Sequence, residues 1–159
     1  MQQGYFHEEE QRIVDLTHQI NSCNNEVEKQ ELKVLRKEKS QALQTWTFRQ
    51  FRMLNANRQV ADLLDIFKDY KTPFSEEEYI DYKEGRTQVK PQSKVGVPPG
   101  GAGECCAPKL LQYAYQHNLK PVCMEEFWVG PSKGSQMRIE GHFYPSCQHK
   151  CVPILAYMM

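Results

Sequence analysis

The segment PGGAGECCAPKLLQYAYQHN at residues 99–118 gives the clearest structural signal in the chain. It follows a proline- and glycine-rich run that ends at Gly103. From residue 104 onward, apolar side chains recur one helical turn apart, at Ala107, Leu110, Leu111 and Ala114. This spacing predicts a helix over 104–118. Pro108 fits this helix because the first turn does not need every backbone N–H as a donor.

The sequence after this helix predicts a small α/β unit over residues 104–159. Residues 121–129 (PVCMEEFWV) have the composition of a mostly buried strand, and residues 137–139 can form a second, short strand. Residues 144–147 (YPSC) open a last helical segment. The expected order in this unit is therefore helix, strand and helix, with a cysteine at each helix start.

Upstream of this unit, residues 71–103 have the composition of a connector. Residues 75–84 are acidic and predict a short helix capped by Ser75, and residues 85–103 are rich in Gly, Pro and Lys. The run 60–70 predicts another short amphipathic helix, which follows the turn-prone Asn55-Ala-Asn57. The expected domain boundary lies at the end of the glycine-rich stretch.

The first 70 residues predict a long helical arm. Apolar or neutral residues recur at alternating steps of three and four, which is the spacing of a coiled-coil seam: Ile13, Leu16, Ile20, Cys23, Val27, Gln30 and Val34. The stretch 21–25 is a weak point because Asn and Ser side chains compete for backbone hydrogen bonds. The arm is therefore either a helical hairpin or one kinked helix. Together with the small α/β unit that follows, it predicts the fold class α+β for the chain.

Charge along the arm changes sign near residue 28. Residues 8–28 carry six acids and one base, whereas residues 29–52 carry seven bases and two acids. Neutralisation between the two halves of a hairpin is one interpretation. The other is that the basic half contacts RNA phosphates. The candidate RNA-binding residues are Lys29, Lys33, Arg36, Lys37, Lys39, Arg49 and Arg52.

Five of the six cysteines lie in the last third of the chain. The N-terminal residues lack the features of a secretory signal, so stable disulfides are not expected and metal binding becomes a candidate role. Cys147 and Cys151 lie four residues apart, and Cys105 lies at a helix start, where the helix dipole favours the thiolate. We predict a zinc site formed by Cys105, Cys147, Cys151 and His142, with Cys106 as the alternative ligand. The competing interpretation is that these are reduced cysteines packed as small hydrophobic residues.

This cysteine pattern resembles that of zinc-dependent nucleoside deaminases. In that family one helix begins with His or Cys, any residue and Glu, and the next helix carries Pro-Cys-x-x-Cys. Here the position two residues after Cys105 is Ala107, and the position two after Cys106 is Pro108, so the proton-shuttling glutamate is missing. The second cysteine pair is also longer by one residue. The resemblance therefore implies at most a degenerate, non-deaminating version of that fold.

A wider resemblance covers most of the chain. The shared elements are Gly-x-Gly-Glu-Cys at 101–105, Ala-Pro-Lys-Leu-Leu at 107–111, Glu-Phe-Trp at 126–128 and Phe-Tyr-Pro-x-Cys-x-x-Lys-Cys at 143–151. Weaker matches occur at residues 39–43 and 54–56. Together they resemble a block found N-terminal to the catalytic domain in some bacterial RluA-type pseudouridine synthases, and Cys105, Cys147 and Cys151 match its cysteines.

This resemblance implies a role in converting uridine to pseudouridine in structured RNA, either rRNA or tRNA. The family's reaction needs no cofactor and uses the aspartate of a His-Arg-Leu-Asp motif, which this sequence does not contain. We therefore expect a non-catalytic accessory region that helps an attached synthase domain to bind RNA. That catalytic domain is expected to follow Met159 in the natural protein.

Other functions are also compatible with the composition. The seam of the arm can mediate homodimerisation or contact with another protein, and a zinc-dependent deaminase-like protein is a second alternative.

The formal net charge is zero, so no overall charge attracts the chain to nucleic acid or membrane. No apolar stretch reaches the roughly 20 residues of a membrane span, and a cytoplasmic location is expected. The G-x-S-x-G, P-loop and H-E-x-x-H motifs are absent.

Overall fold

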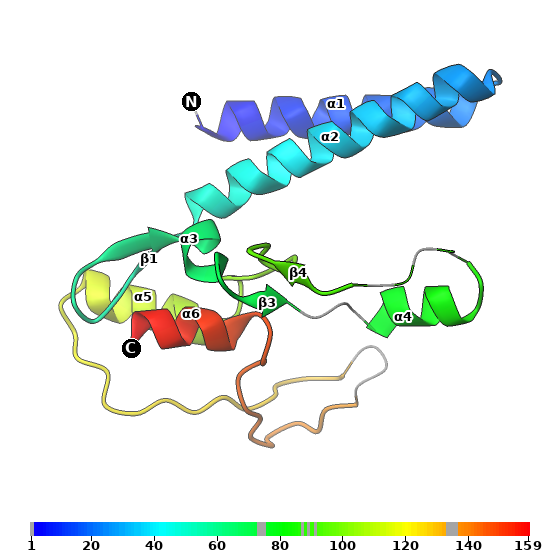
Figure 1. Ribbon diagram of the computed structural model, residues 1–159. Coiled ribbons are helices and arrows are strands. Elements are labelled where there is room, and N and C mark those ends of the chain that lie inside the picture. Colours follow the sequence, from blue (N-terminus) through cyan, green and yellow to red (C-terminus); the bar gives the residue numbers. More distant parts are fainter. Residues whose placement is uncertain (1, 73–75, 87, 89, 91, 133–136) are drawn as a thin grey trace. The chain divides into compact units, whose positions relative to one another are not determined.

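The chain divides between Gln50 and Phe51 into two units, each with its own internal packing. Figure 1 shows them in a computed structural model that describes residues 2–72, 76–86, 88, 90, 92–132 and 137–159. The fold is α+β, as expected. The expected arm, 1–70, is longer than the first unit because residues 51–72 pair and pack within the second unit.

The first unit is a helical hairpin of α1 (Gln2–Ser22) and α2 (Glu26–Gln50) (Figure 1). Asn25 begins α2 by accepting a hydrogen bond at Oδ1 from the backbone N–H of Val27 at 3.0 Å. The two helices are antiparallel, since Tyr5 near the start of α1 lies against Trp46 near the end of α2, with ring centroids 5.3 Å apart. The hairpin alternative is therefore confirmed, and the single kinked helix is wrong.

A buried carboxylate joins the two helices. Glu9 is 7% exposed, and its carboxylate accepts hydrogen bonds from Arg12 Nη1 at 2.5 Å and from Lys39 Nζ at 3.3 Å. Lys39 lies on α2, so this ion pair fixes how the helices align along each other. Ile20 is buried in the same hairpin, so part of the predicted seam is used within one chain.

Replacing Glu9 with glutamine is expected to lower the free energy of unfolding of the hairpin by about 1–2 kcal/mol. Glutamine keeps the size of the side chain but removes the charge that binds Arg12 and Lys39. Urea denaturation followed by helical circular dichroism measures the loss. The matched control is Glu8→Gln on the exposed face of α1. Equal stability of the two variants would contradict a structural role for the Glu9 carboxylate.

The second unit begins with an antiparallel pair, β1 (Arg52–Leu54) and β2 (Val60–Asp62). The turn between them is held by Asn55, whose side-chain Oδ1 accepts from the N–H groups of Asn57 at 3.0 Å and Gln59 at 2.8 Å. The predicted helix over 60–70 is wrong at its start, because Val60–Asp62 pair with β1 instead. A shorter helix, α3 (Leu63–Phe67), follows and is capped by Asp62.

The core of the second unit forms where three helices meet the β1–β2 pair. α5 (Cys106–Gln116) packs against α6 (Cys151–Met158), both contact β1, and α3 also contacts α6. The Gln112 side chain on α5 ties this helix to β1, because its Oε1 accepts from Leu54 N–H at 2.8 Å and its Nε2 donates to Arg52 O at 3.0 Å. The buried apolar residues of this core include Met53, Leu63, Phe67, Ala107, Leu111, Ile154 and Met158. The helix predicted over 104–118 is confirmed with slightly shorter bounds.

The predicted connector, 71–103, belongs to the second unit. β3 (Lys71–Thr72) pairs antiparallel with β4 (Lys94–Val95), and Pro98 is fully buried. The acidic helix is present as α4 (Glu76–Lys83). The predicted cap at Ser75 lies outside the described residues. The expected boundary at residue 103 therefore differs from the division of the chain after Gln50.

Residues 119–132 and 137–150, here called the excursion, lie between α5 and α6 in the chain and run outside the packed helices (Figure 1). The strands predicted at 121–129 and 137–139 are wrong, since the described part of the excursion holds a single bridge between Phe127 and Phe143. Phe127 is 58% exposed and Val129 is 70% exposed. Among the residues that the structure describes, no neighbouring strand covers these apolar side chains, so their β propensity does not produce a buried strand.

Among the helices within the described ranges, none has both the length and the apolar character that crossing a bilayer demands.

Candidate metal centre and basic groove

Three cysteine thiols meet where α5 and α6 begin. Cys105 is the residue before α5, Cys147 lies in the turn before α6, and Cys151 is the first residue of α6. The three sulfur atoms all lie within 4.8 Å of one another. Cys151 is buried, whereas Cys105 and Cys147 are half-buried. Cys105 and Cys151 are 46 residues apart in the sequence, and the packing of α5 against α6 brings their thiols together.

The Cys147–Cys151 pair is formed by a turn. The carbonyl oxygen of Cys147 accepts from the N–H groups of Cys151 at 3.2 Å and Val152 at 3.1 Å. The two sulfurs lie 3.2 Å apart, and Cys147 Sγ also accepts from Cys151 N–H at 3.2 Å. The prediction that residues 144–147 already form helix is wrong, because α6 begins only at Cys151. The four-residue spacing still brings the sulfurs together because the turn closes over the same length of chain.

The surroundings of the thiols affect their acidities differently. Burial raises the pKa of Cys147, but hydrogen bonds from the Cys151 thiol, the backbone of Cys151 and Lys150, and the Cys105 thiol outweigh burial and lower it overall. Burial raises the pKa of Cys151, and its interactions with Cys105 and Cys147 raise it further. The cluster thus favours one thiolate and opposes several together unless a cation is bound.

The geometry of the cluster fits a zinc ion. With zinc–sulfur bonds of about 2.3 Å and tetrahedral angles, ligand sulfurs lie about 3.8 Å apart. The sulfurs of Cys147 and Cys151 are slightly closer than that, and no pair in the cluster exceeds 4.8 Å. Small side-chain rotations suffice to place all three around one ion. These three residues can hold a metal.

Gly103 sets the path of the chain into Cys105. Its φ is +84°, and a β-carbon there would lie 2.9 Å from Cδ1 of Phe51 and 3.0 Å from Cε of Met53. Only glycine tolerates both the left-handed backbone and the close approach to β1. The loop 101–103 therefore positions the start of α5, and with it Cys105.

Gly103→Ala is expected to destabilise the second unit by about 1–3 kcal/mol and to weaken metal binding at the cysteine cluster. The added methyl group must displace Phe51, which shifts the loop that leads to Cys105. Thermal denaturation and zinc titration measure the two effects. Gly100→Ala is the matched control, because no atom lies within 4 Å of its added carbon. If Gly103→Ala bound zinc and unfolded like Gly100→Ala, the loop would not control the position of Cys105.

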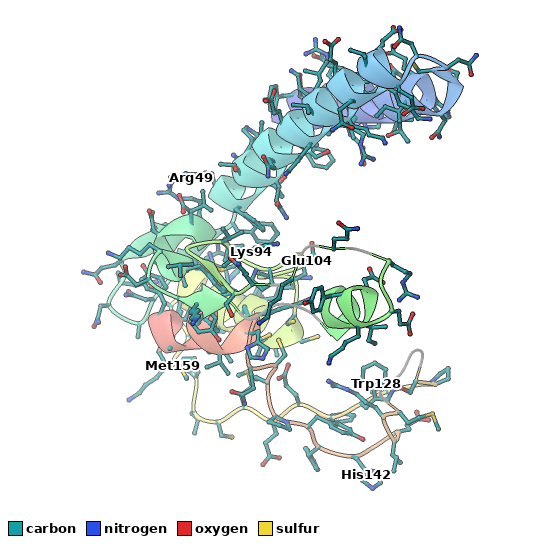
Figure 2. All side chains as sticks on the ribbon, turned by 45° about the vertical axis from the view of Figure 1, so that its right-hand side comes forward. Arg49, Lys94, Glu104, Trp128, His142 and Met159 are labelled. Atoms are coloured by element: carbon teal, nitrogen blue, oxygen red, sulfur yellow. The ribbon has the colours of Figure 1, made fainter. Side chains whose placement is uncertain are left out.

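The fourth predicted zinc ligand, His142, is not a member of the cluster. It is exposed on the excursion, where its carbonyl oxygen accepts from Trp128 N–H at 3.0 Å. Figure 2 shows His142 far from Glu104, the residue that precedes Cys105. Cys106, the predicted alternative ligand, is exposed and also lies outside the cluster.

A basic groove of about 670 Å³ lies between α1 and α2. Three of the predicted RNA-binding residues, Lys33, Arg36 and Lys37, line it from α2. The remaining lining residues are Thr17, Ile20, Asn21, Ser40, Gln41 and Gln44, so the lining contains no acid. The polar members Gln41 and Gln44 were missed by the sequence interpretation. Their spacing of four and seven residues from Lys37 places them on the same helix face.

The other four predicted RNA-binding residues lie elsewhere. Lys39 pairs with the buried Glu9, and Lys29 Nζ lies 3.9 Å from the carboxylate of Glu26. Arg49 lies near the end of α2, and Arg52 lies in β1 of the second unit. The predicted surface is thus divided, and the groove brings three of its seven members together.

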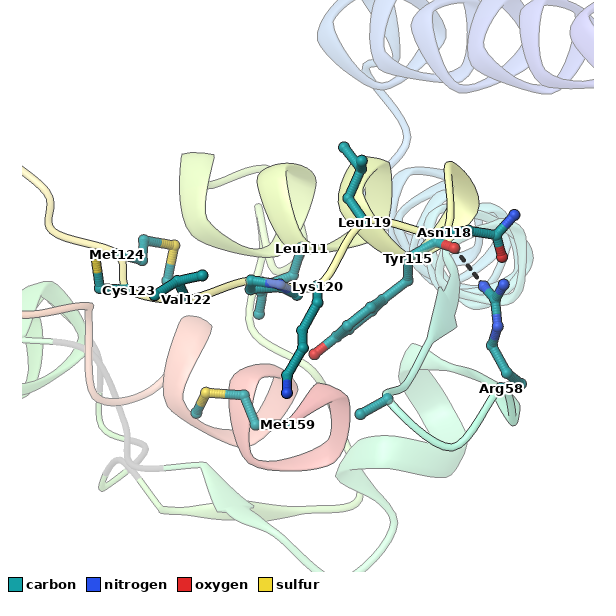
Figure 3. A pocket seen from close by; sticks show the side chains of 12 residues that line it. Arg58, Leu111, Tyr115, Asn118, Leu119, Lys120, Val122, Cys123, Met124 and Met159 are labelled. Atoms are coloured by element: carbon teal, nitrogen blue, oxygen red, sulfur yellow. Dashed lines mark hydrogen bonds between the residues drawn. The ribbon is translucent and has the colours of Figure 1, made fainter.

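A further pocket of about 620 Å³ lies beside α5 in the second unit (Figure 3). Its walls are mostly apolar and include Leu111, Tyr115 and Met159. Arg58 donates to the carbonyl oxygen of Tyr115 at one edge, and Lys120 also lines the pocket. The lining does not include His, Asp, Glu or Ser, and its polar side chains are Arg58, Tyr115, Asn118 and Lys120, together with the thiol of Cys123.

No known protein family, no curated protein and no solved structure matches this chain.

Proposed function

We propose that this chain is a non-catalytic, RNA-binding accessory region of a pseudouridine synthase. The groove between α1 and α2 carries this proposal. Lys33, Arg36 and Lys37 are exposed, no ion pair occupies them among the described residues, and no acid lines the groove with them. Cations held close together without counter-charges attract a phosphate backbone.

The polar lining of the groove supports the same proposal. Ser40, Gln41 and Gln44 add neutral donors and acceptors next to the three cations. Such groups bind phosphate oxygens and ribose hydroxyls without reading a base sequence. The groove is therefore suited to hold a structured RNA in position for an enzyme domain rather than to select a sequence.

The test is titration of a structured ribosomal or transfer RNA with the whole chain at several salt concentrations. We expect binding that weakens steeply as salt rises, because phosphate contacts release counterions. The same chain is expected to leave uridine in that RNA unchanged. Undetectable binding at low salt, or an affinity independent of salt, contradicts the proposed role.

We also propose that the cysteine cluster binds zinc, which joins the starts of α5 and α6. The observation that favours this is the convergence of Cys105, Cys147 and Cys151 within 4.8 Å. A structural zinc links segments that a small core holds only weakly. Metal analysis of protein purified without a histidine tag should give about one zinc per chain. Less than about a tenth of an equivalent means the thiols are reduced cysteines packed in the core.

Homodimerisation through the arm is the competing proposal. Val27 and Val34 of the predicted seam are 71% and 49% exposed, so this part of the seam is not used within the hairpin. Light scattering distinguishes the two proposals, since a stable dimer without RNA affinity favours the interaction role. The deaminase-like alternative is the weaker one, because Ala107 occupies the position of the proton-shuttling glutamate.

A further inference from the structure

We infer that a zinc ion held by Cys105, Cys147 and Cys151 keeps its fourth coordination position open to an external thiol. This inference rests on the proposed zinc site and extends it from a structural link to a ligand-binding centre. Zinc in proteins takes four ligands, and sites with three protein ligands leave the fourth position to water or substrate.

The first observation is the size of the ligand group. Within the residues that the structure describes, the group contains three cysteines and no fourth Cys, His, Asp or Glu. The neighbouring candidates Glu104, Cys106 and His149 lie outside this group, and the Glu104 carboxylate lies beside Gly101. Cys106 is exposed, and His149 Nδ1 lies 3.4 Å from the hydroxyl of Tyr70.

The second observation is access to the cluster. Cys151 is 1% exposed and closes the inner side of the cluster, whereas Cys105 and Cys147 are half-buried. An ion bound by these sulfurs therefore has its protein ligands on the core side, and its remaining position is directed away from Cys151. The solvent-facing side of the cluster is therefore the side of Cys105 and Cys147.

The third observation is the local charge. Zinc with three thiolates carries a formal charge of −1, so a fourth anionic ligand needs compensation. The N-terminal, positive ends of α5 and α6 both lie at the cluster. Lys150 Nζ and the carboxylate oxygen Oε2 of Glu104 both lie beside Gly101, so these two charges offset each other. The two helix N-termini supply partial positive charge, and a soft, sulfur-rich ion favours a thiolate as the external ligand. On binding, the thiol sulfur replaces water at the ion, and the thiol proton passes to solvent.

The test uses the whole chain loaded with cobalt(II), which reports coordination through its absorption bands. 2-Mercaptoethanol is added in increasing amounts after excess cobalt has been removed. We expect the sulfur-to-cobalt charge-transfer band to grow by about one third, as sulfur ligands rise from three to four. A saturable change with the tetrahedral bands retained supports the open position.

Two outcomes separate this inference from the zinc proposal. If cobalt binds but the thiol leaves the spectrum unchanged, the fourth position is filled by the protein and the inference is wrong, whereas metal binding stands. Cys106→Ser, His142→Ala and His149→Ala then identify the closing ligand by the change in their spectra. If the chain does not bind cobalt or zinc, the metal site itself is wrong.

Discussion

Cys105→Ser is expected to remove bound zinc from the whole chain while the second unit stays folded. Cys105 is the residue before α5, a position at which serine is a favourable cap, so the substitution does not weaken the start of the helix. It removes one of three sulfur ligands, and two thiolates are too few to hold zinc against competition from buffer. Bound zinc should fall from about one equivalent to less than about a tenth.

Thermal denaturation with and without a chelator measures the consequence for stability. At free zinc about a thousand times the dissociation constant, binding stabilises the folded state by about 4 kcal/mol. Wild-type protein should lose this stability on chelation, whereas Cys105→Ser should be insensitive to the chelator. Cys106→Ser is the matched control, since that thiol is exposed and outside the cluster. Loss of zinc from both variants to the same extent would contradict the assignment of Cys105.

Neutralising the groove is expected to remove most of the salt dependence of RNA binding. The variant replaces Lys33, Arg36 and Lys37 with glutamine, which keeps a long side chain and a high helix propensity. Each lost phosphate contact lowers the slope of log affinity against log salt by about 0.7–0.9, so three contacts lower it by about 2–3. At low salt, wild type binds RNA more tightly than the variant. A fourfold rise in salt should reduce this ratio of affinities by roughly 20- to 40-fold.

The control carries the same change in net charge at another place. Lys68, Lys109 and Lys120 are exposed bases of the second unit, and replacing them with glutamine leaves the groove intact. Filter binding or fluorescence anisotropy across a salt series compares the two variants. Equal losses would mean that overall charge and not the groove attracts the RNA, and unchanged binding in both would remove the hairpin from the RNA interface.

Patterns with a full helical period predicted the helices well. The recurrence from Ala107 to Ala114 predicted α5. The seam from Ile13 to Ile20 and the Asn-rich break near residue 23 predicted helix on both sides of the break, but they left open a hairpin or one kinked helix. These patterns were sufficient because one amphipathic helix needs only one apolar face and a terminating signal, both of which are local. The helix α4 is predicted by other features, the acidic composition of residues 75–84 and a cap at Ser75.

The predicted strands failed because strands depend on partners. Residues 121–129 have the residue types of a buried strand, yet Val122 is 94% exposed and the segment joins no sheet. Val60–Asp62, in contrast, read as helix and form β2 because β1 lies next to them in antiparallel register. The side-chain types of a segment indicate whether it can join a sheet. They do not show whether another strand lies beside it to pair with.

The sequence by itself determined most of the helices, the charge change along the arm and the proximity of Cys147 to Cys151. Only the tertiary structure decided that His142 stays apart from Cys105, that Lys39 is used by Glu9, and that Lys33, Arg36 and Lys37 share one groove. The physical reason is that helix periodicity acts over a few residues, whereas ligand sets and ion pairs depend on which distant segments pack together. Packing of α5 against α6 brings Cys105 to Cys151, and no spacing along the chain encodes that contact.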